Sequence, residues 1–185
     1  MRRALGAGLL VAALLLAGCS RGTDAPEVVE PTVAASSARA VAVPEVAPDQ
    51  RFALDDLATF DDGLEVEVAG SVAGRATAND QGADRSGGEI VTASIRIGNN
   101  TDEAYDPRLA TITATYGDGT VASPVVNPTE KVTGTFAEPI AVQGEGVAAA
   151  GFAIPAAELT EVTFVVDLAD GTHDPVSFTG KVEQG

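Results

Sequence analysis

From Arg51 onward, apolar residues recur at every second position in short runs, which are separated by glycine, proline, asparagine and aspartate. This alternation is typical of β-strands that are buried on one face and solvated on the other. The predicted strands with the clearest pattern are Val91–Ile97, Ala110–Tyr116, Val162–Leu168 and Val176–Val182, and three further predicted strands are Leu64–Val72, Glu130–Phe136 and Val147–Ile154. Only Ala156–Leu159 has the pattern of a helical turn. The sequence therefore predicts an all-β domain.

The turns between these runs carry their own signals. Asp62-Gly63, Asp118-Gly119 and Asp170-Gly171 supply the positive φ that tight turns need. Pro155 lacks a backbone donor and should end the strand before it. Seven to nine short antiparallel strands at this spacing predict a two-layer β-sandwich over residues 51–185. Because this range has no tryptophan and no cysteine, its core must consist mainly of Val, Ile, Leu and Ala, with six phenylalanines between the layers.

The N-terminal segment has the layout of an export signal. Arg2 and Arg3 precede an apolar run that ends in Leu16-Ala17-Gly18, immediately before Cys19. A charged start, a short apolar segment and small residues before a cleavage site are typical of a secretory signal peptide, predicted here for residues 1–18. The run of about 14 residues is too short for a membrane-spanning helix, which needs roughly 20. A twin-arginine signal lacks support because the polar residues that flank such a pair are missing.

Leu16-Ala17-Gly18-Cys19 resembles the lipobox of bacterial lipoproteins. The resemblance implies cleavage between Gly18 and Cys19, a thioether-linked diacylglycerol on Cys19, and often a third acyl chain on the freed amine. Two or three chains anchor a protein stably, at about 0.8 kcal/mol per buried methylene. An ordinary signal followed by a chance cysteine is the alternative. We therefore expect the membrane to be a partner through the lipid on Cys19, with the protein on the extracytoplasmic face of the cell membrane.

Residues 19–50 are predicted to be a flexible linker. They contain four prolines among Ala, Ser, Val and Glu, with no aromatic residue and no sustained period. Such a chain is extended and would hold the domain away from the membrane. Within it, Ala38–Val46 alternates alanine and valine and is a candidate edge strand.

The chain is strongly acidic, with a formal net charge of −16 that becomes two units more negative when Arg2 and Arg3 leave with the signal. Nucleic acid is excluded as a partner, because phosphate binding needs a basic face. The preference for arginine over lysine indicates a GC-rich, Gram-positive bacterium. An acidic surface favours solubility and cationic ligands.

Catalytic motifs are missing from the sequence. A Ser-His-Asp arrangement needs a histidine, and the only one is His173, which we interpret as a solvated turn residue. Zinc would need three or four His or Cys ligands, and no phosphate-binding glycine loop occurs. The carboxylate pairs Asp55-Asp56 and Asp61-Asp62 have the residue types of acid/base hydrolysis, but such neighbours are common in a chain this acidic. We expect no enzymatic activity, no catalytic residues, no metal and no cofactor.

Calcium is an alternative because it needs only clustered oxygen ligands. The candidate groups are Asp61 and Asp62, Asn79-Asp80 with Asp84, and Asp170 with Asp174. None fits the EF-hand spacing, and aspartate and asparagine occupy tight turns without any ion. The 16-residue stretch from Ala73 to Gly88 has no large apolar residue and is interpreted as a mobile loop, with a binding loop as the alternative.

One family resemblance follows from these motifs. Val91–Ile97 runs into Gly98-Asn99-Asn100-Thr101, and Gly146–Gly151 later precedes Phe152-Ala153-Ile154-Pro155. Over roughly 64–182 the chain resembles uncharacterised bacterial lipoproteins whose domain is immunoglobulin-like and related to the mycobacterial immunoprotective extracellular protein. Where that group commonly has Pro-Gly, this chain has Gln143-Gly144. The resemblance implies an immunoglobulin-like sandwich without catalytic residues to carry over.

These observations together predict a membrane-anchored lipoprotein whose domain binds or interacts without catalysis. An envelope protein is the expected partner. The alternative is a binder of a small solute, a cation such as Ca²⁺, or a cell-wall polymer.

Overall fold

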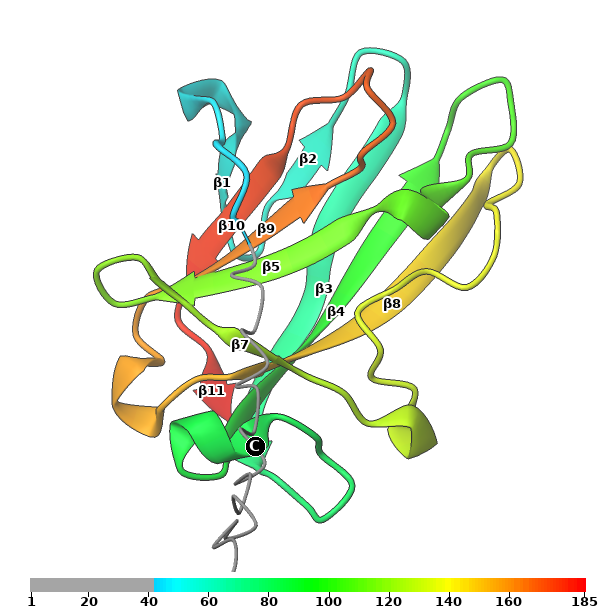
Figure 1. The fold of residues 1–185 in the computed structure, drawn as a ribbon. Helices are drawn as coiled ribbons and strands as arrows, with labels where there is room; N and C mark the ends of the chain where they lie inside the picture. The colour runs from blue at the N-terminus through cyan, green and yellow to red at the C-terminus, as the bar shows by residue number, and fades with distance from the viewer. Residues whose placement is uncertain (1–41) are drawn as a thin grey trace, which may run out of the picture. The chain divides into compact units, whose positions relative to one another are not determined.

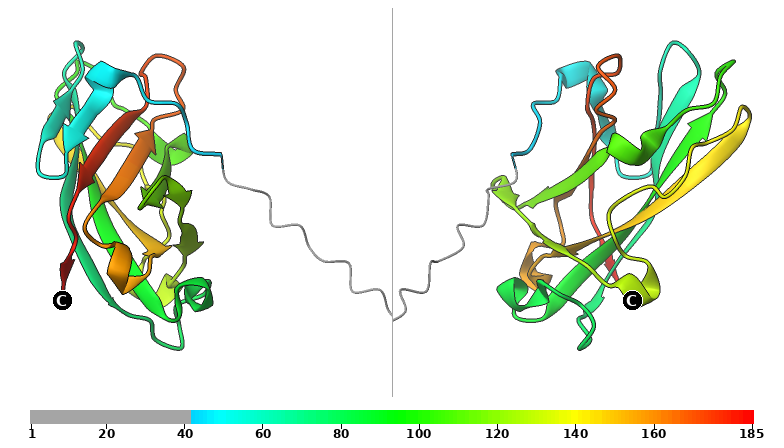
Figure 2. Two further views of the ribbon diagram at one scale, coloured as in Figure 1. Left: turned by 90° about the vertical axis from the view of Figure 1, so that its left-hand side faces the viewer. Right: turned by 45° about the vertical axis from the view of Figure 1, so that its right-hand side comes forward.

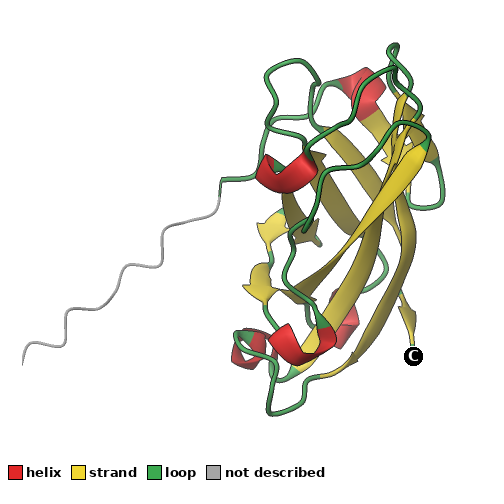
Figure 3. Cartoon of the chain, turned by 90° about the vertical axis from the view of Figure 1, so that its right-hand side faces the viewer, coloured by secondary structure: helices red, strands yellow, loops and turns green. Residues whose placement is uncertain are grey.

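The computed structural model describes residues 42–185. Eleven strands form two sheets that pack face to face (Figure 1, Figure 2). The strands are β1 (Arg51–Ala53), β2 (Leu57–Thr59), β3 (Leu64–Arg75), β4 (Glu89–Asn99), β5 (Thr111–Tyr116), β6 (Thr120–Val121), β7 (Ser123–Val125), β8 (Gly144–Ala153), β9 (Val162–Asp167), β10 (Val176–Gly180) and β11 (Glu183–Gln184). The helical segments of the described part are short 3-10 helices in the connections (Figure 3): η1 (Pro48–Gln50), η2 (Ala83–Ser86), η3 (Pro107–Leu109), η4 (Pro128–Glu130) and η5 (Ala156–Glu158). The predicted all-β fold is confirmed.

The strand order is that of an immunoglobulin-like sandwich. One sheet has the order β1-β10-β9-β5-β6, and the other has β11-β3-β4-β8-β7 with β2 also paired to β3. The chain passes between the sheets from β4 to β5 and again from β8 to β9. The neighbours β3-β4-β8-β7 and β10-β9-β5-β6 therefore match the order A-B-E-D and G-F-C-C′ of immunoglobulin folds.

Most strand pairs are antiparallel as predicted, but two pairs are parallel. β1 pairs parallel with β10, and β11 pairs parallel with β3. The described part has eleven strands instead of the expected seven to nine, because five of them have three residues or fewer. Strands of that length are too short to show a period of two.

The long strands lie where the alternation predicted them. In β4, Val91, Ala93, Ile95 and Ile97 are fully buried between the sheets, while the residues between them face outward. Pro155 follows the end of β8, and the predicted helical turn is η5. The glycines of the three predicted turns all have positive φ, between 74° and 97°. Local sequence therefore predicts these long strands and the three tight turns.

The core between the sheets is mostly aliphatic, with four buried phenylalanines. Phe152 and Phe164 meet at a ring-centroid distance of 5.9 Å, and Phe52 stacks on Phe178 at 5.7 Å. Phe52 and Phe60 are only partly buried but pack against this core. All six phenylalanines thus contribute to the interior, as the sequence predicted.

The predicted strand Glu130–Phe136 is wrong. The side chain of Asn127 accepts a hydrogen bond from the backbone N–H of Glu130 at 3.2 Å, which caps η4. Lys131 then adopts a positive φ of 59° and Gly134 one of 69°. These left-handed residues turn the backbone out of the extended conformation that a strand needs. The alternation of apolar residues here marks a connection whose Val132 and Phe136 are buried.

A buried asparagine organises the connection between β4 and β5. Asn99 is fully buried, and its amide nitrogen donates to the carbonyls of Glu103 at 2.8 Å and Ile140 at 3.0 Å. Its carbonyl oxygen accepts from the backbone N–H and the hydroxyl of Thr101, at 3.1 and 2.7 Å. The Asn-Asn-Thr motif is therefore a structural turn whose first asparagine has no exposed surface.

The chain before β1 is packed against the domain from Val46 onward. Val46 is 9% exposed, and the guanidinium of Arg51 donates to its carbonyl oxygen at 2.9 Å through Nη2. Residues 42–46, the described half of the candidate edge strand Ala38–Val46, form no strand.

Candidate binding site

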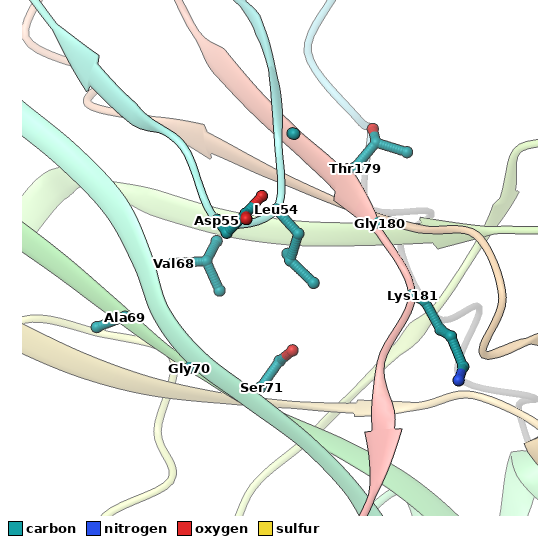
Figure 4. A pocket seen from close by; sticks show the side chains of 10 residues that line it. Leu54, Asp55, Val68, Ala69, Gly70, Ser71, Thr179, Gly180 and Lys181 are labelled. Carbon is teal, nitrogen blue, oxygen red and sulfur yellow. The ribbon is translucent and has the colours of Figure 1, made fainter.

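An open cavity of about 480 Å³ lies between the two sheets, at the side formed by β1, β3 and β10. We call it the edge cavity. Figure 4 shows the side chains of Leu54, Val68 and Ser71 directed into this space, whereas Lys181 extends away from it. The lining is completed by Ala53, Asp55, Ala69, Gly70, Thr179 and Gly180.

The edge cavity exists because the chain crosses between the sheets twice on this side. The first crossing joins β1 to β2, and the second joins β10 to β11. On β3, the pairing with β2 ends at Glu67 and the pairing with β11 begins at Val72. No strand of the described part pairs with β3 on this edge between those two residues.

This unpaired stretch of β3 is also irregular. The register with β4 shifts between Val68 and Gly70, so that Ala69 is a bulge. A bulge bends its strand and increases the local twist. Ala69 and Gly70 are exposed, and backbone N–H and C=O groups of the stretch remain available to another chain.

The wall on the other sheet depends on a close contact between Leu54 and Gly180. A Cβ at position 180 would lie 2.6 Å from the Cβ of Leu54, which is far below contact distance. Gly180 therefore lets Leu54 close the interior behind the edge cavity. The nearest cation, Lys181, pairs with Glu183 at 2.9 Å, and both side chains are exposed.

A second cluster lies at one end of the sandwich, where the β2–β3 turn, the β4–β5 connection and the β9–β10 loop meet. The imidazole of His173 lies 2.8 Å (Nδ1) from Asp170 Oδ2 and 3.1 Å (Nε2) from Asp62 Oδ2. Phe60 packs edge-on against the imidazole with the ring centroids 4.5 Å apart. The side chain of His173 is only 10% exposed, so the interpretation of a solvated turn histidine is wrong. Sequence reasoning missed this cluster because its members come from distant turns.

Two groups in this cluster, Asp170 and Tyr105, have shifted pKa values. Partial burial raises the pKa of Asp170, but hydrogen bonds from the backbone and side chain of His173 and from the Thr172 N–H outweigh it and lower the pKa to about 2. Tyr105 donates its hydroxyl proton to Asp170 Oδ2 at 3.1 Å. Burial and the negative charge of Asp170 raise the pKa of Tyr105 above its ordinary value. Asp170 is therefore an ionised acceptor for its own loop and for the β4–β5 connection.

Three members of the candidate calcium groups, Asp62, Asp80 and Asp170, are hydrogen-bond acceptors in turns. Asp80 accepts from the backbone N–H and hydroxyl of Thr77, at 2.6 and 2.8 Å, and from Asn127 at 2.8 Å. The backbone N–H of Thr77 is the largest cause of a lowered pKa at Asp80. Within residues 42–185, no group of three or more His, Cys, Asp or Glu side chains is arranged to hold a metal ion.

The stretch from Ala73 to Gly88 is more structured than a mobile loop. β3 continues to Arg75, and η2 occupies its second half. Gln81 exchanges two backbone hydrogen bonds with Val126, each at 3.0 Å. Ala83 is buried in a small cluster with Val125 and Ala153. The stretch therefore packs against β7 and β8, and the mobile interpretation is not supported.

The predicted lipid-attachment motif lies outside the described residues. This applies to Leu16, Ala17, Gly18 and Cys19 alike. Among the helical segments of residues 42–185, none is both long and apolar enough to span a bilayer.

Comparison with known proteins gives distant structural likenesses. No protein-family model and no curated protein matches the sequence. The putative lipoprotein ycdA of Bacillus subtilis is similar with a TM-score of 0.48 and 13% identity, over 68% of this chain and 38% of that chain. An uncharacterised β-sandwich protein of Clostridium difficile is similar with a TM-score of 0.45 and 11% identity, over 75% of this chain and 99% of that one. At these values the likenesses carry no information about a ligand.

Proposed function

We propose that this protein is a non-catalytic binding protein, anchored by lipid on Cys19 at the extracytoplasmic face of the cell membrane. We further propose that its sandwich binds a short extended segment of an envelope protein at the edge cavity. Support for the anchor comes from the lipobox-like Leu16-Ala17-Gly18-Cys19. The resemblance to lipoproteins with an immunoglobulin-like domain supports the same placement.

The observation that carries the binding proposal is the unpaired stretch of β3 from Val68 to Ser71. Exposed strand edges bind extended peptides through main-chain hydrogen bonds, and adjacent pockets select side chains. Four strand residues span about 13 Å at about 3.3 Å each, so three or four residues of a partner fit. Leu54 and Val68 offer an apolar surface to one partner side chain.

The charge of the protein favours a basic partner. The formal net charge is −16, and Asp55 lies in the wall of the edge cavity. Complementary charge mainly increases the rate of association and excludes acidic competitors. We therefore expect lysine or arginine on either side of the bound segment.

A pair of photo-crosslinking variants tests the site. A photoreactive residue replaces Ser71 in the edge cavity or, as the matched control, Ser94 on β4, and both proteins are expressed in the native host with Cys19 intact. We expect one dominant adduct from position 71 that maps to a single extended segment. A synthetic peptide of that segment should abolish the adduct.

Two results would count against the site. Equal products from both positions, or an adduct that the peptide does not displace, would refute binding at the edge cavity. Adducts with wall polymer at position 71 would favour the alternative of a polymer binder. The anchor is tested separately: the Cys19→Ala variant should lose the diacylglyceryl mass and leave the membrane fraction, and an unmodified Cys19 in the native protein would refute lipidation.

A further inference from the structure

One imidazole connects two turns that belong to different sheets. Asp62 lies in the turn between β2 and β3, whereas His173 and Asp170 lie in the loop between β9 and β10. The only side-chain hydrogen bond that joins these two turns in the described part runs from His173 Nε2 to Asp62 Oδ2, at 3.1 Å. The opposite ring nitrogen lies 2.8 Å from Asp170 Oδ2.

Both contacts are hydrogen bonds only when the ring is doubly protonated. An ionised carboxylate is solely an acceptor, so each ring nitrogen must carry a proton to donate. A neutral imidazole has one N–H, and it would keep only one of the two bonds. Histidine is the side chain that ordinarily changes charge between pH 5 and pH 8.

The charged groups that face the ring are all acidic. Together with His173, an open cavity of about 240 Å³ is lined by groups from η1, the β2–β3 turn and the β9–β10 loop: Gln50, Phe60, Asp61, Asp62, Thr172 and Asp174. Asp170 and the hydroxyl of Tyr105 face the ring from its own loop and from the β4–β5 connection. Loss of the ring proton would remove the one positive charge among four carboxylates, which would then repel one another.

The two carboxylates are not equally fixed. Asp170 is held within its own loop, where its Oδ1 accepts from the backbone N–H groups of Thr172 and His173 at 2.9 and 3.0 Å. Asp62 accepts one backbone hydrogen bond, from Leu64 at 3.0 Å, and its side chain is 46% exposed. The remaining proton of a neutral ring would therefore stay with Asp170, and Asp62 would be released.

We propose that His173 is a proton-dependent clasp that joins the β2–β3 turn to the β9–β10 loop when doubly protonated and releases Asp62 when it loses a proton. The clasp is closed at acidic pH and opens as the pH rises. Opening removes the side-chain hydrogen bond between the β2–β3 turn and the β9–β10 loop, while the backbone hydrogen bonds of the β2–β3 turn remain.

The test is a pH titration of the isotope-labelled intact chain in micelles, followed by NMR. Because the chain has a single histidine, its ring signals belong to His173. The chemical shift of the Leu64 backbone amide reports on Asp62, because this amide donates a hydrogen bond to Asp62 Oδ1. Between pH 5 and 8, we expect the Leu64 amide to shift with the same midpoint as the ring.

Three variants make the test specific. Asp62→Asn should remove the coupled shift at Leu64. His173→Gln should leave the Leu64 amide without a midpoint in this range. Asp174→Asn, in the same cavity but without a bond to the ring, should keep the coupling. The clasp would be overturned if the chemical shift of the Leu64 amide did not change with the ring signals, or if it changed with them equally in Asp62→Asn. The wild-type titration alone decides the first outcome, even if a variant fails to fold.

Discussion

Replacing Asn99 by alanine should destabilise the domain far more than the same change at the neighbouring Asn100. The Asn99 side chain is fully buried and makes four hydrogen bonds, which tie the turn at Thr101 and the carbonyls of Glu103 and Ile140 to the end of β4. The side chain of Asn100 is exposed and makes no hydrogen bond within the described part.

The expected magnitude follows from these bonds. Each contributes about 1 kcal/mol net, and a buried group left without a partner costs about 1–3 kcal/mol. The carbonyl of Ile140 keeps the backbone N–H of Tyr105 at 2.9 Å, and Thr101 is partly exposed to water, which reduces the loss. We expect Asn99→Ala to lower the free energy of unfolding by about 2–4 kcal/mol, and Asn100→Ala by less than about 0.5 kcal/mol.

Urea unfolding followed by circular dichroism measures the difference. With a slope of about 2 kcal/mol per molar urea, the midpoint of Asn99→Ala should fall by about 1–2 M at an unchanged slope. Asn99→Asp should be no better than alanine, because a carboxylate cannot donate to Ile140. Midpoints for Asn99→Ala and Asn100→Ala that agree within error would show that the asparagine does not organise this connection.

Three further changes probe other features. Gly180→Ala should lower the free energy of unfolding by about 1–3 kcal/mol, because the new methyl group clashes with Leu54. Adding Leu54→Ala should recover part of that loss. Additive effects in a double-mutant cycle, measured by urea unfolding, would contradict the contact. Ala169 has a φ of 53°, which glycine adopts without strain, so Ala169→Gly should raise the free energy of unfolding by up to about 1 kcal/mol. A lower thermal midpoint for Ala169→Gly would argue against strain at this position. The pKa of Asp170 in the folded state is about 2, below its ordinary 3.8, so its stabilisation is present above about pH 4 and lost as the pH falls toward 2. Asp170→Asn should therefore be less stable than wild type at pH 6 but not at pH 2, and an equal deficit at both pH values would refute this.

The sequence predicts the parts of the fold that depend on local pattern. Where one face of a strand is buried, as in Val91–Ile97, a period of two follows and the strand can be read directly. The run Glu130–Phe136 has a similar pattern, but the cap from Asn127 and the positive φ at Lys131 override it. Periodicity alone does not distinguish a strand from an irregular segment with buried side chains.

The two sites found in the structure depend on tertiary contacts and could not be predicted from the sequence. The edge cavity arises because two connections cross between the sheets at the same side, and neither connection carries a motif. His173 and Asp62 are 111 positions apart, and each on its own looks like an ordinary turn residue. The predicted lipid-attachment motif is the opposite case, because its signal lies in four consecutive residues and needs no fold to be recognised.

The parallel pairing of β1 with β10 also determines how the domain would respond to force. A pull on the chain before Arg51 loads the first end of β1, while a pull through the chain after Gly180 loads the opposite end of its partner. The two strands are then sheared along their length, so the register from Arg51 to Ala53 must fail as a unit instead of opening one bond at a time. With the proposed N-terminal tether, force applied across the domain is therefore carried by the pairing of β1 with β10.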